Sequence, residues 1–456
     1  MRIPALLLFT LWLFFPAAVQ AQPVSPPPEV NPMVQKMVDA VRADSIRANV
    51  ETMVGFKTRH TLSDTVSNEE GVGAARRWLK AKFERISEQC GGCLEVRYQK
   101  TVVEEGETDR IPGDTPVYNV VAIQRGVEHP NRYVLIGGHL DSRVSDIMDS
   151  TSVAPGANDD ASGVAGAIEA ARVLSKHEFE SSLIYVGYTG EEQGLFGSTH
   201  AAEVAVEEEW KMAGVLNNDM IGNIRGIDGV VENNTFRVFS QRRPSDLHEE
   251  TWSTRYFGGE NDGPSRQLGR YVATQAETHV RQLDPVLIYR LDRFGRGGDQ
   301  MPFADRGFPA VRIMETHENY TRQHQDLRVE DGVRYGDRID GVNFDYAAKL
   351  TGVNVATMAS LASGPPRPDS VQIGGAASSS TTLSWAAVDH EDLAGYKIYW
   401  RRTAAPRWQH SAFVPDGDTH HTLEDVVIDN WLFGVAAVDK EGNESPVVFP
   451  HGLLDD

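Results

Sequence analysis

Apolar residues in the first three quarters of the chain fall into short continuous runs separated by helical patterns. Four runs indicate buried strands: 118–123 (YNVVAI), 132–138 (RYVLIGG), 181–189 (SSLIYVGYT) and 212–219 (MAGVLNND). Residues 163–176 (GVAGAIEAARVLSK) carry a helical pattern between the second and third runs. Continuous apolar strands that alternate with helices are typical of a sheet buried on both faces. We therefore predict an α/β fold with a mixed, mostly parallel sheet flanked by helices.

Helical patterns also precede and follow these strands. Apolar positions recur at helical spacing in 46–54 and in 71–87. Later elements are predicted at 267–280 (helix), 307–315 (strand) and 344–362 (closing helix). Residues 223–265 are polar and rich in glycine, and we expect them to cover the functional edge of the sheet.

The pattern changes at Pro365, within the linker-like sequence SGPPRPDS. Short segments that alternate apolar and polar residues follow, namely TTLSW, AGYKIYWRR, HHTLEDV and WLFGVAAVDKEGNES. This spacing predicts an all-β sandwich. With Trp385 after Leu-Ser and the Tyr396/Tyr399 strand, the stretch resembles a fibronectin type III domain. Such sandwiches often space domains or bind a polymer or a surface, and residues 365–456 carry no catalytic constellation.

Residues 1–21 have the order and length of a secretory signal peptide. Arg2 precedes the apolar stretch LLLFTLWLFF, and the small residues Val19 and Ala21 favour cleavage after Ala21. The alternative is an uncleaved anchor helix, for which the apolar stretch is short. We expect a secreted or periplasmic protein with no membrane insertion after cleavage, whose α/β part spans 22–364.

The net charge of the chain limits the classes of partner that we expect. The sequence has 44 Lys and Arg against 65 Asp and Glu, a net charge of -21. An acidic surface is repelled by phosphate backbones and anionic lipids, so we expect no nucleic-acid partner.

Cysteine occurs only as Cys90 and Cys93, in EQCGGCLEV. The pair is compatible with half of a metal site, with a redox pair or with a local disulfide. In an exported protein, a Gly-Gly turn after a helix favours a small structural disulfide.

Candidate metal-binding side chains occur in five segments. Three follow predicted strands: His139 and Asp141 in GGHLDS, Glu191 and Glu192 in YTGEEQGLFGS, and Asp219 in NNDMIG. Asp159 and Asp160 in PGANDDASG stand at the start of a predicted helix, and His324 in ENYTRQHQDL lies near the end of the same part of the chain. Each alone has a structural explanation; an Asp that begins a helix, for example, is often a cap. The carboxyl ends of parallel strands meet at one edge, however, where ligands bind. Imidazoles and carboxylates together suit zinc, and an excess of carboxylates suggests two ions that share a bridging acid.

These motifs, in this order, resemble the dinuclear-zinc aminopeptidases of the zinc exopeptidase group. That group includes bacterial leucyl aminopeptidases, plasma glutamate carboxypeptidase, glutaminyl cyclase and the transferrin receptor ectodomain. The resemblance covers about 50–360. It implies two zinc ions bridged by Asp159, with His139 and Asp219 completing one site and Glu192 and His324 the other.

The resemblance also implies roles beyond the metal ligands. Glu191 would act as general base, and Asp141 would orient His139. The peptide bond between Asp159 and Asp160 would be cis.

Two positions depart from the family pattern. The last histidine of the family often directly follows a Tyr, whereas Tyr320 lies four residues before His324. His317, in METHENY, is therefore a rival ligand. Residues 298–300 are Gly-Asp-Gln where the family has Ser-Asp-His, which leaves the role of this loop open.

The expected function is a secreted aminopeptidase, or a related exopeptidase, that acts on peptides or proteins. A water shared by two zinc ions loses a proton readily, and Glu191 would pass that proton to the leaving amine. One alternative is a glutaminyl cyclase-type acyltransferase with a single zinc, and another is a non-catalytic binding protein. A His-Glu-x-x-His helix and a Gly-x-Ser-x-Gly elbow are both absent from the sequence.

Overall fold

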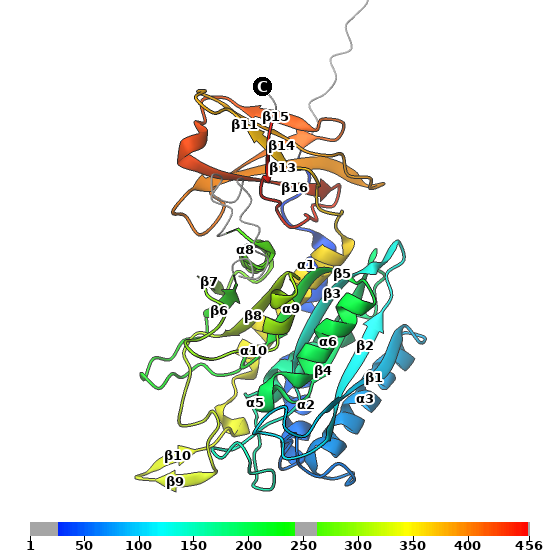
Figure 1. Ribbon diagram of the computed structural model, residues 1–456, viewed down its shortest axis with the longest axis vertical. Helices are drawn as coiled ribbons and strands as arrows, with labels where there is room; N and C mark the ends of the chain where they lie inside the picture. The colour runs from blue at the N-terminus through cyan, green and yellow to red at the C-terminus, as the bar shows by residue number, and fades with distance from the viewer. Residues whose placement is uncertain (1–25, 242–261, 455–456) are drawn as a thin grey trace, which may run out of the picture.

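The computed structural model describes residues 26–241 and 262–454. These residues form an α/β part built on one large sheet and, above it in Figure 1, a part built of two smaller sheets. The predicted signal peptide lies outside the described residues, as do residues 242–261 of the expected covering loop.

The large sheet is mixed, with the strand order β1-β2-β4-β3-β5-β8-β6-β7. Its centre, β4-β3-β5-β8, is parallel, and β1 and β2 join antiparallel at one side. At the other side β6 runs antiparallel to β8 and parallel to β7. The strands are β1 (Leu94–Val103), β2 (Thr115–Gln124), β3 (His129–His139), β4 (Ser181–Tyr188), β5 (Lys211–Asn218), β6 (Thr235–Ser240), β7 (Asp284–Ile288) and β8 (Ala310–Glu315). The predicted mixed, mostly parallel sheet is thus confirmed.

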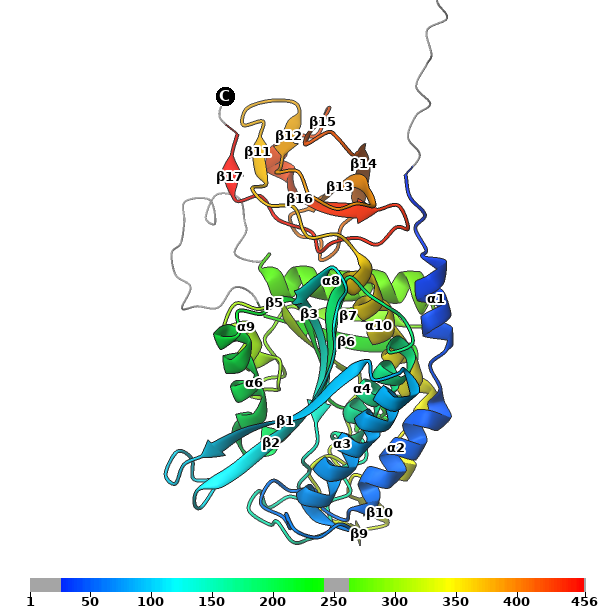
Figure 2. The ribbon, with the colours of Figure 1, turned by 90° about the vertical axis from the view of Figure 1, so that its right-hand side faces the viewer.

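Helices cover both faces of this sheet (Figure 2). Successive side chains of a strand point to opposite faces, so Val134 and Ile136 of β3 enter one core while Tyr133 and Leu135 enter the other. The first core also contains side chains of α1–α4, α8 and α10, and the second contains those of α6 and α9. The helices are α1 (Pro32–Asp39), α2 (Ala43–Gly55), α3 (Gly71–Gln89), α4 (Ala161–Leu174), α5 (Glu191–Gly194), α6 (Phe196–Glu207), α8 (Pro264–His279), α9 (Met301–Asp305) and α10 (Phe344–Ser363).

The C-terminal part is all-β, as predicted. A four-stranded sheet, β15-β12-β11-β17, and a three-stranded sheet, β14-β13-β16, enclose a core that includes Trp385, Tyr396 and Phe433. The strands are β11 (Gln372–Gly374), β12 (Thr381–Ser384), β13 (Leu393–Arg402), β14 (His410–Pro415), β15 (His420–Leu423), β16 (Trp431–Asp439) and β17 (Gly452–Leu453). The resemblance to a fibronectin type III domain stays a prediction.

The C-terminal sheets are fastened to the α/β part by buried charged groups. Asp262 is paired with Arg270 of α8 and with Arg401 of β13. Arg132 of β3 donates to the backbone carbonyl oxygen of Pro365, the first residue of the C-terminal part, at 3.3 Å. The sequence SGPPRPDS therefore joins two parts that are in contact, and it does not act as a free tether.

Two local predictions are confirmed by the structure. Cys90 and Cys93 form a disulfide at the end of α3. The peptide bond between Asp159 and Asp160 is cis. In addition, none of the helices in the described ranges combines the length and the apolar character that a membrane span requires.

Candidate metal centre

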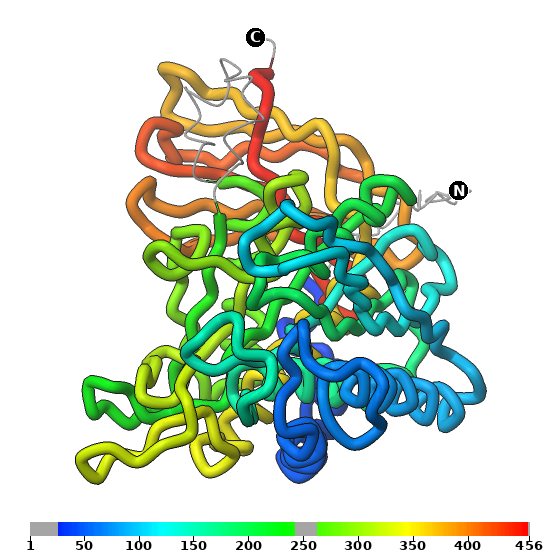
Figure 3. Tube along the Cα trace, turned by 60° about the horizontal axis from the view of Figure 1, so that its bottom comes forward, coloured from blue at the N-terminus to red at the C-terminus, as the bar shows by residue number. Residues whose placement is uncertain are grey.

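The residues predicted to bind a metal meet where the central strands end. His139 is the last residue of β3, Asp219 follows β5, and Glu191 begins α5 after β4. A small hairpin, β9 (Arg328–Glu330) and β10 (Val333–Tyr335), lies at the same end of the molecule. Figure 3, with this end turned toward the viewer, shows loops from distant parts of the chain gathered there.

Asp159 lies between the two predicted histidine ligands. Its Oδ1 is 3.0 Å from Nε2 of His139, and its Oδ2 is 3.0 Å from Nε2 of His324. Asp219 Oδ2 lies 3.9 Å from His139 Nε2, and Glu192 Oε1 lies 3.2 Å from His324 Nε2. Three groups of potential ligands result, each with donor atoms within 4.8 Å of one another, and Asp159 belongs to two of them.

The donor chemistry of these groups fits zinc. Each group combines one imidazole with two carboxylates, which zinc binds readily. Glu192 Oε1 and Asp219 Oδ1 are buried and have no hydrogen-bond partner. A buried carboxylate oxygen left without a partner is costly, and a bound cation would remove that cost.

The ring of His139 is oriented for a ligand role. Its Nδ1 lies 3.0 Å from the backbone carbonyl oxygen of Asp141, which accepts only from a protonated nitrogen. With the proton on Nδ1, the lone pair of Nε2 faces Asp159 and Asp219. A metal-binding histidine commonly has its tautomer fixed by such a second contact.

The adjacent glutamates differ in their electrostatic surroundings. Burial raises the pKa of Glu191 well above the usual carboxyl range, and the charges of Glu192 and Asp219 raise it further. Burial also raises the pKa of Glu192, but His324 overrides this effect and lowers it to about 2. Glu192 is thus ready to bind a cation, whereas Glu191 holds a proton more readily.

Asp160 has a structural role, separate from that of Asp159. Its Oδ1 accepts from the backbone N–H of Gly163 at 3.0 Å as the cap of α4, and its Oδ2 accepts from the backbone N–H of His139 at 3.1 Å. A Cβ on Gly138 would lie 2.5 Å from Oδ2 of Asp160, and a Cβ on Gly163 would lie 2.1 Å from the carbonyl oxygen of Asn218. Both motifs therefore need their glycines for this close packing.

Asp141 supports the glutamates more directly than it supports His139. Its carboxylate oxygens accept from the backbone N–H groups of Gly190 at 3.0 Å and of Glu192 at 3.1 Å. Its Oδ1 lies 3.9 Å from His139 Nδ1, beyond hydrogen-bond distance, so the backbone carbonyl of Asp141 orients the ring instead. The carboxylate of Asp141 thus fixes the start of α5.

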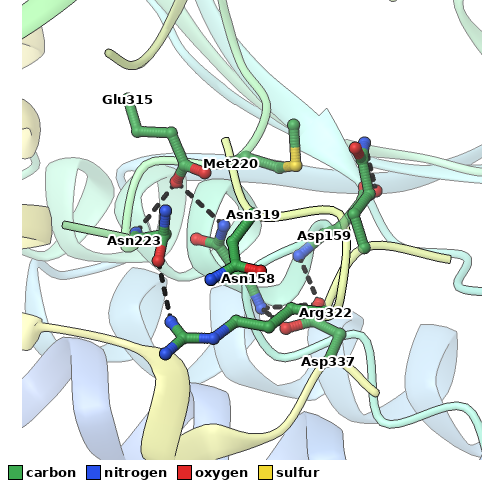
Figure 4. A pocket seen from close by; sticks show the side chains of 9 residues that line it. Asn158, Asp159, Met220, Asn223, Glu315, Asn319, Arg322 and Asp337 are labelled. Atoms are coloured by element: carbon green, nitrogen blue, oxygen red, sulfur yellow. Dashed lines mark hydrogen bonds between the residues drawn. The ribbon is translucent and has the colours of Figure 1, made fainter. Parts of the chain in front are cut away.

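A polar network holds the loop that carries Asp159 (Figure 4). The carboxylate of Asp337 accepts from the backbone N–H of Asn158 at 2.9 Å and of Asp159 at 2.7 Å. Glu315 accepts from the side-chain amide of Asn158 at 2.9 Å. These groups border a cavity of about 10 Å³, which has room for about one water molecule.

Three charged residues at this edge escape the sequence prediction. Arg312 Nη2 lies 2.8 Å from Asp219 Oδ2, and Arg143 donates from Nε to Glu192 Oε2 at 2.9 Å. Burial raises the pKa of Asp299 to about 7. Arg143 directly follows the motif GGHLDS, and Asp299 lies in the loop 298–300 that departs from the family pattern, so the sequence could have pointed to both residues. Arg312 lies within a predicted strand, and no local pattern in the sequence marks it.

The rival histidine lies elsewhere. His317 Nδ1 is 3.0 Å from Oδ2 of the half-exposed Asp228, and across the described ranges no group of potential metal ligands contains His317. His324 instead enters such a group, with a backbone φ of 53°. Non-glycine residues with positive φ are uncommon and often occur at functional sites.

Comparisons with known proteins agree with this geometry. Residues 119–330 match the model of peptidase family M28. The chain is 39% identical over 439 residues to a probable zinc metalloprotease of Pyrenophora tritici-repentis, covering 95% of this chain and 90% of that protein. It is 41% identical over 430 residues to a probable zinc metalloprotease of Leptosphaeria maculans, covering 94% and 98%.

Solved structures share the fold at lower identity. LapA of Legionella pneumophila is 22% identical with a TM-score of 0.52, covering 73% of this chain and 76% of that one. LapB of the same organism is 18% identical with a TM-score of 0.52, covering 73% and 75%. Together with the identity to the fungal zinc metalloproteases over nearly the whole chain, the match to the family model shows that the chain is a zinc metallopeptidase that belongs to peptidase family M28.

Proposed function

We propose that this metallopeptidase is a secreted aminopeptidase that binds two zinc ions and hydrolyses the N-terminal peptide bond of peptides. One observation carries the proposal: the two carboxylate oxygens of Asp159 each lie 3.0 Å from a different histidine. A carboxylate that faces two sets of ligands in this way is suited to bridge two ions. Secretion rests on residues 1–21 alone.

The proposed ligand sets follow from the two groups that share Asp159. His139 and Asp219 would hold one ion, and Glu192 and His324 the other. Bound zinc supplies a Lewis acid that polarises a carbonyl group and makes a nearby water more acidic.

Glu191 is proposed as the general base. Its ligand oxygen lies within 4.8 Å of ligand atoms of His139 and Glu192, which places it beside both sets. Burial raises its pKa, which suits a group that must take a proton near neutral pH. Glu191 would accept the proton of the attacking water and return it to the leaving amine.

Preference for a free N-terminus is supported by the charges on the His139 side of the centre. The charges of Asp219 and Asp299 both raise the pKa of Glu191, so the three acids lie close together, and such a concentration of acids attracts an α-ammonium group. The fold likeness includes a Legionella pneumophila structure described as the LapA aminopeptidase, at 21% identity and a TM-score of 0.51.

The test is hydrolysis of aminoacyl-anilides and of N-terminally blocked peptides. We expect cleavage only with a free N-terminus, loss of activity on chelation, and recovery with zinc. Glu191→Gln should lower kcat by about 10²–10⁴-fold with zinc still bound, whereas Glu84→Gln, on the exposed side of α3, should not. Full activity in Glu191→Gln would overturn the mechanism, and cleavage of blocked peptides would overturn the aminopeptidase assignment.

A further inference from the structure

The guanidinium of Arg59 joins the loop after β3 to the loop before α4. Arg59, in the loop after α2, is only 1% exposed. Its Nε donates at 2.7 Å to the backbone carbonyl oxygen of Leu140, which directly follows the predicted ligand His139. Its terminal nitrogens donate to the carbonyl oxygens of Pro155 at 2.6 Å and of Gly156 at 2.9 Å, in the loop that carries the shared aspartate. One buried side chain thus connects two loops that bear metal ligands.

The shape of the guanidinium fixes where the two loops lie relative to each other. The group is planar and rigid, so the acceptors that it binds are held at set positions. It also donates to the carbonyl oxygen of Met53 at 3.2 Å, which anchors it to the last turn of α2. A Cβ on Gly156 would lie 2.8 Å from Nη2 of Arg59, and the φ of Gly156 is 50°. The close approach of this loop to the guanidinium therefore requires glycine.

Two hydroxyl groups strengthen the same connection. The hydroxyl of Ser142 accepts from the backbone N–H of Arg59 at 3.1 Å and donates to the carbonyl oxygen of Ala154 at 2.8 Å. The hydroxyl of Thr61 donates to the carboxylate of Asp141 at 3.0 Å. That carboxylate also binds the backbone N–H groups at the start of α5. The segment around Arg59 therefore contacts both ligand loops and, through Asp141, reaches the helix that carries the two glutamates.

The contacts of Arg59 hold backbone and do not balance an acid. Its four side-chain hydrogen bonds all go to backbone carbonyl oxygens, and among the residues that the structure describes no carboxylate forms an ion pair with it. Burying a cation costs free energy unless it is well hydrogen-bonded. We propose that Arg59 is a positioning residue of the metal centre, whose guanidinium sets the distance between the loops of His139 and Asp159. The proposal rests on the ligand sets proposed above, and Arg59 acts on them only through the backbone.

Substitution of Arg59 tests whether zinc binding depends on the shape of the guanidinium. Arg59→Lys keeps the positive charge and removes the planar group, whereas Arg59→Met removes both. Zinc titration against a competing chelator should show an affinity about 10–100-fold lower in Arg59→Lys, which is the scale for residues that orient metal ligands. Arg59→Met should lose at least as much. Wild-type zinc affinity in both variants would overturn the proposal.

Arg132 offers a matched control at the other end of β3. Its terminal nitrogens also donate to two backbone carbonyl oxygens, those of Gly364 at 2.8 Å and Pro365 at 3.3 Å. Arg132→Lys should lower the stability of the fold and keep the wild-type zinc affinity. Cobalt(II) bound in place of zinc adds a spectroscopic readout, because its visible absorption depends on the geometry of its ligands. This spectrum should change in Arg59→Lys alone, and equal losses of zinc affinity in the two lysine variants would contradict a positioning role.

The metal-free protein gives a second readout. In chelated Arg59→Lys, the backbone amides of residues 139–142 and 153–160 should exchange hydrogen faster than in the wild type, because the two loops open more often. Arg132→Lys should leave their exchange unchanged. Ser142→Ala removes only the hydroxyl link and should lower zinc affinity by a smaller factor. If neither Arg59 variant folds, unchanged zinc affinity in Ser142→Ala would overturn the proposal.

These measurements separate the role of Arg59 from the proposed function. Zinc affinity and hydrogen exchange are both measured without a substrate. Cleavage of blocked peptides would therefore end the aminopeptidase assignment and leave the role of Arg59 intact. Faster exchange in Arg59→Lys with wild-type zinc affinity would show the reverse: Arg59 would hold the loops, but the metal centre would not depend on it.

Discussion

Two clusters of buried charge, one at the metal centre and one between the two parts of the molecule, differ in how their charges are balanced. Between the two parts, the fully buried carboxylate of Asp262 is paired with Arg270 and Arg401. Both of its oxygens accept from Arg401, at 2.8 and 2.7 Å. At the metal centre, Asp159, Glu192 and Asp219 gather in a small volume, and two of their oxygens have no hydrogen-bond partner.

The difference separates a structural cluster from one built to bind. The carboxylate at the interface is satisfied by side chains of the same chain, so nothing needs to be added there. Arg143 and Arg312 each contact one oxygen of a carboxylate at the metal centre. The other oxygens, Glu192 Oε1 and Asp219 Oδ1, are buried without a hydrogen-bond partner, and a cation from solution would satisfy them. Burial alone does not identify a functional site, whereas a group of buried carboxylate oxygens without partners indicates one.

The largest expected effect removes the shared carboxylate. Asp159→Asn should lower bound zinc to at most one ion per chain and reduce kcat/KM by more than about 10³-fold, because both ligand sets lose a member. Zinc content measured by elemental analysis beside anilide hydrolysis tests this expectation. Asp228→Asn, which removes the partner of His317, should change neither quantity. Two zinc ions in Asp159→Asn would show that Asp159 does not bridge them.

Loss of the buried carboxylate between the two parts of the molecule should lower the stability of the fold and leave zinc binding and activity unchanged. Asp262→Asn leaves Arg270 and Arg401 buried without their carboxylate, and the free energy of unfolding should fall by about 3 kcal/mol. Zinc content and kcat/KM per folded molecule should stay at their wild-type values. Asp340→Asn breaks an exposed pair with Arg334 and should cost less than about 1 kcal/mol. Denaturant unfolding measures both, and equal losses in the two variants would contradict a special role for the interface.

Sequence patterns predicted the centre of the fold better than its margins. The four predicted central strands are present, because strands buried on both faces are continuously apolar. The sequence analysis did not predict β1, because it is an edge strand whose pattern, LEVRYQKTVV, mixes exposed and buried positions. The sequence analysis did not predict β6 either, because it is short and lies within a polar, glycine-rich stretch.

His139, Glu192 and Asp219 could be predicted because they directly follow central strands, whereas Asp159 and His324 were assigned through the family resemblance. The structure brings together His139, Asp159, Glu192, Asp219 and His324 across 185 residues of sequence (139 to 324). Their partners were not predicted, because Arg312 and Asp337 act through contacts between distant elements that no local pattern contains. Short motifs encode the ligands, whereas tertiary packing decides what supports them.

A substitution of Arg312 would show how strongly the metal centre depends on positive charge that the protein itself supplies. This fully buried arginine joins Asp219 at 2.8 Å to Asp292 at 3.1 Å. Arg312→Met should weaken zinc binding and lower kcat/KM by about 10–100-fold, because Asp219 loses the group that orients it. Zinc titration against a competing chelator measures the affinity directly, and Arg312→Lys should recover part of it. Wild-type zinc affinity in Arg312→Met would show that Asp219 needs no such support.

The smallest expected effect concerns the metal-free protein, where the acids of the centre should destabilise the fold. Burial raises the pKa of Glu191 above its ordinary value of 4.5, so its ionised form is less stable in the folded state than in the unfolded one. Ionised Glu191 therefore lowers stability progressively as the pH rises above about 4.5, the unfolded-state pKa, and below that pH it is protonated in both states. With zinc removed, Glu191→Gln should raise the unfolding temperature at pH 8 by about 2–4 °C, and the gain should shrink toward zero as the pH falls to about 4.5. Circular dichroism melts of the two chelated proteins across this range measure the gain, with Glu84→Gln as the exposed control. A Glu191→Gln protein that is less stable than the wild type at pH 8 would show that the carboxylates of the metal centre are compensated within the chain, as those of the interface are.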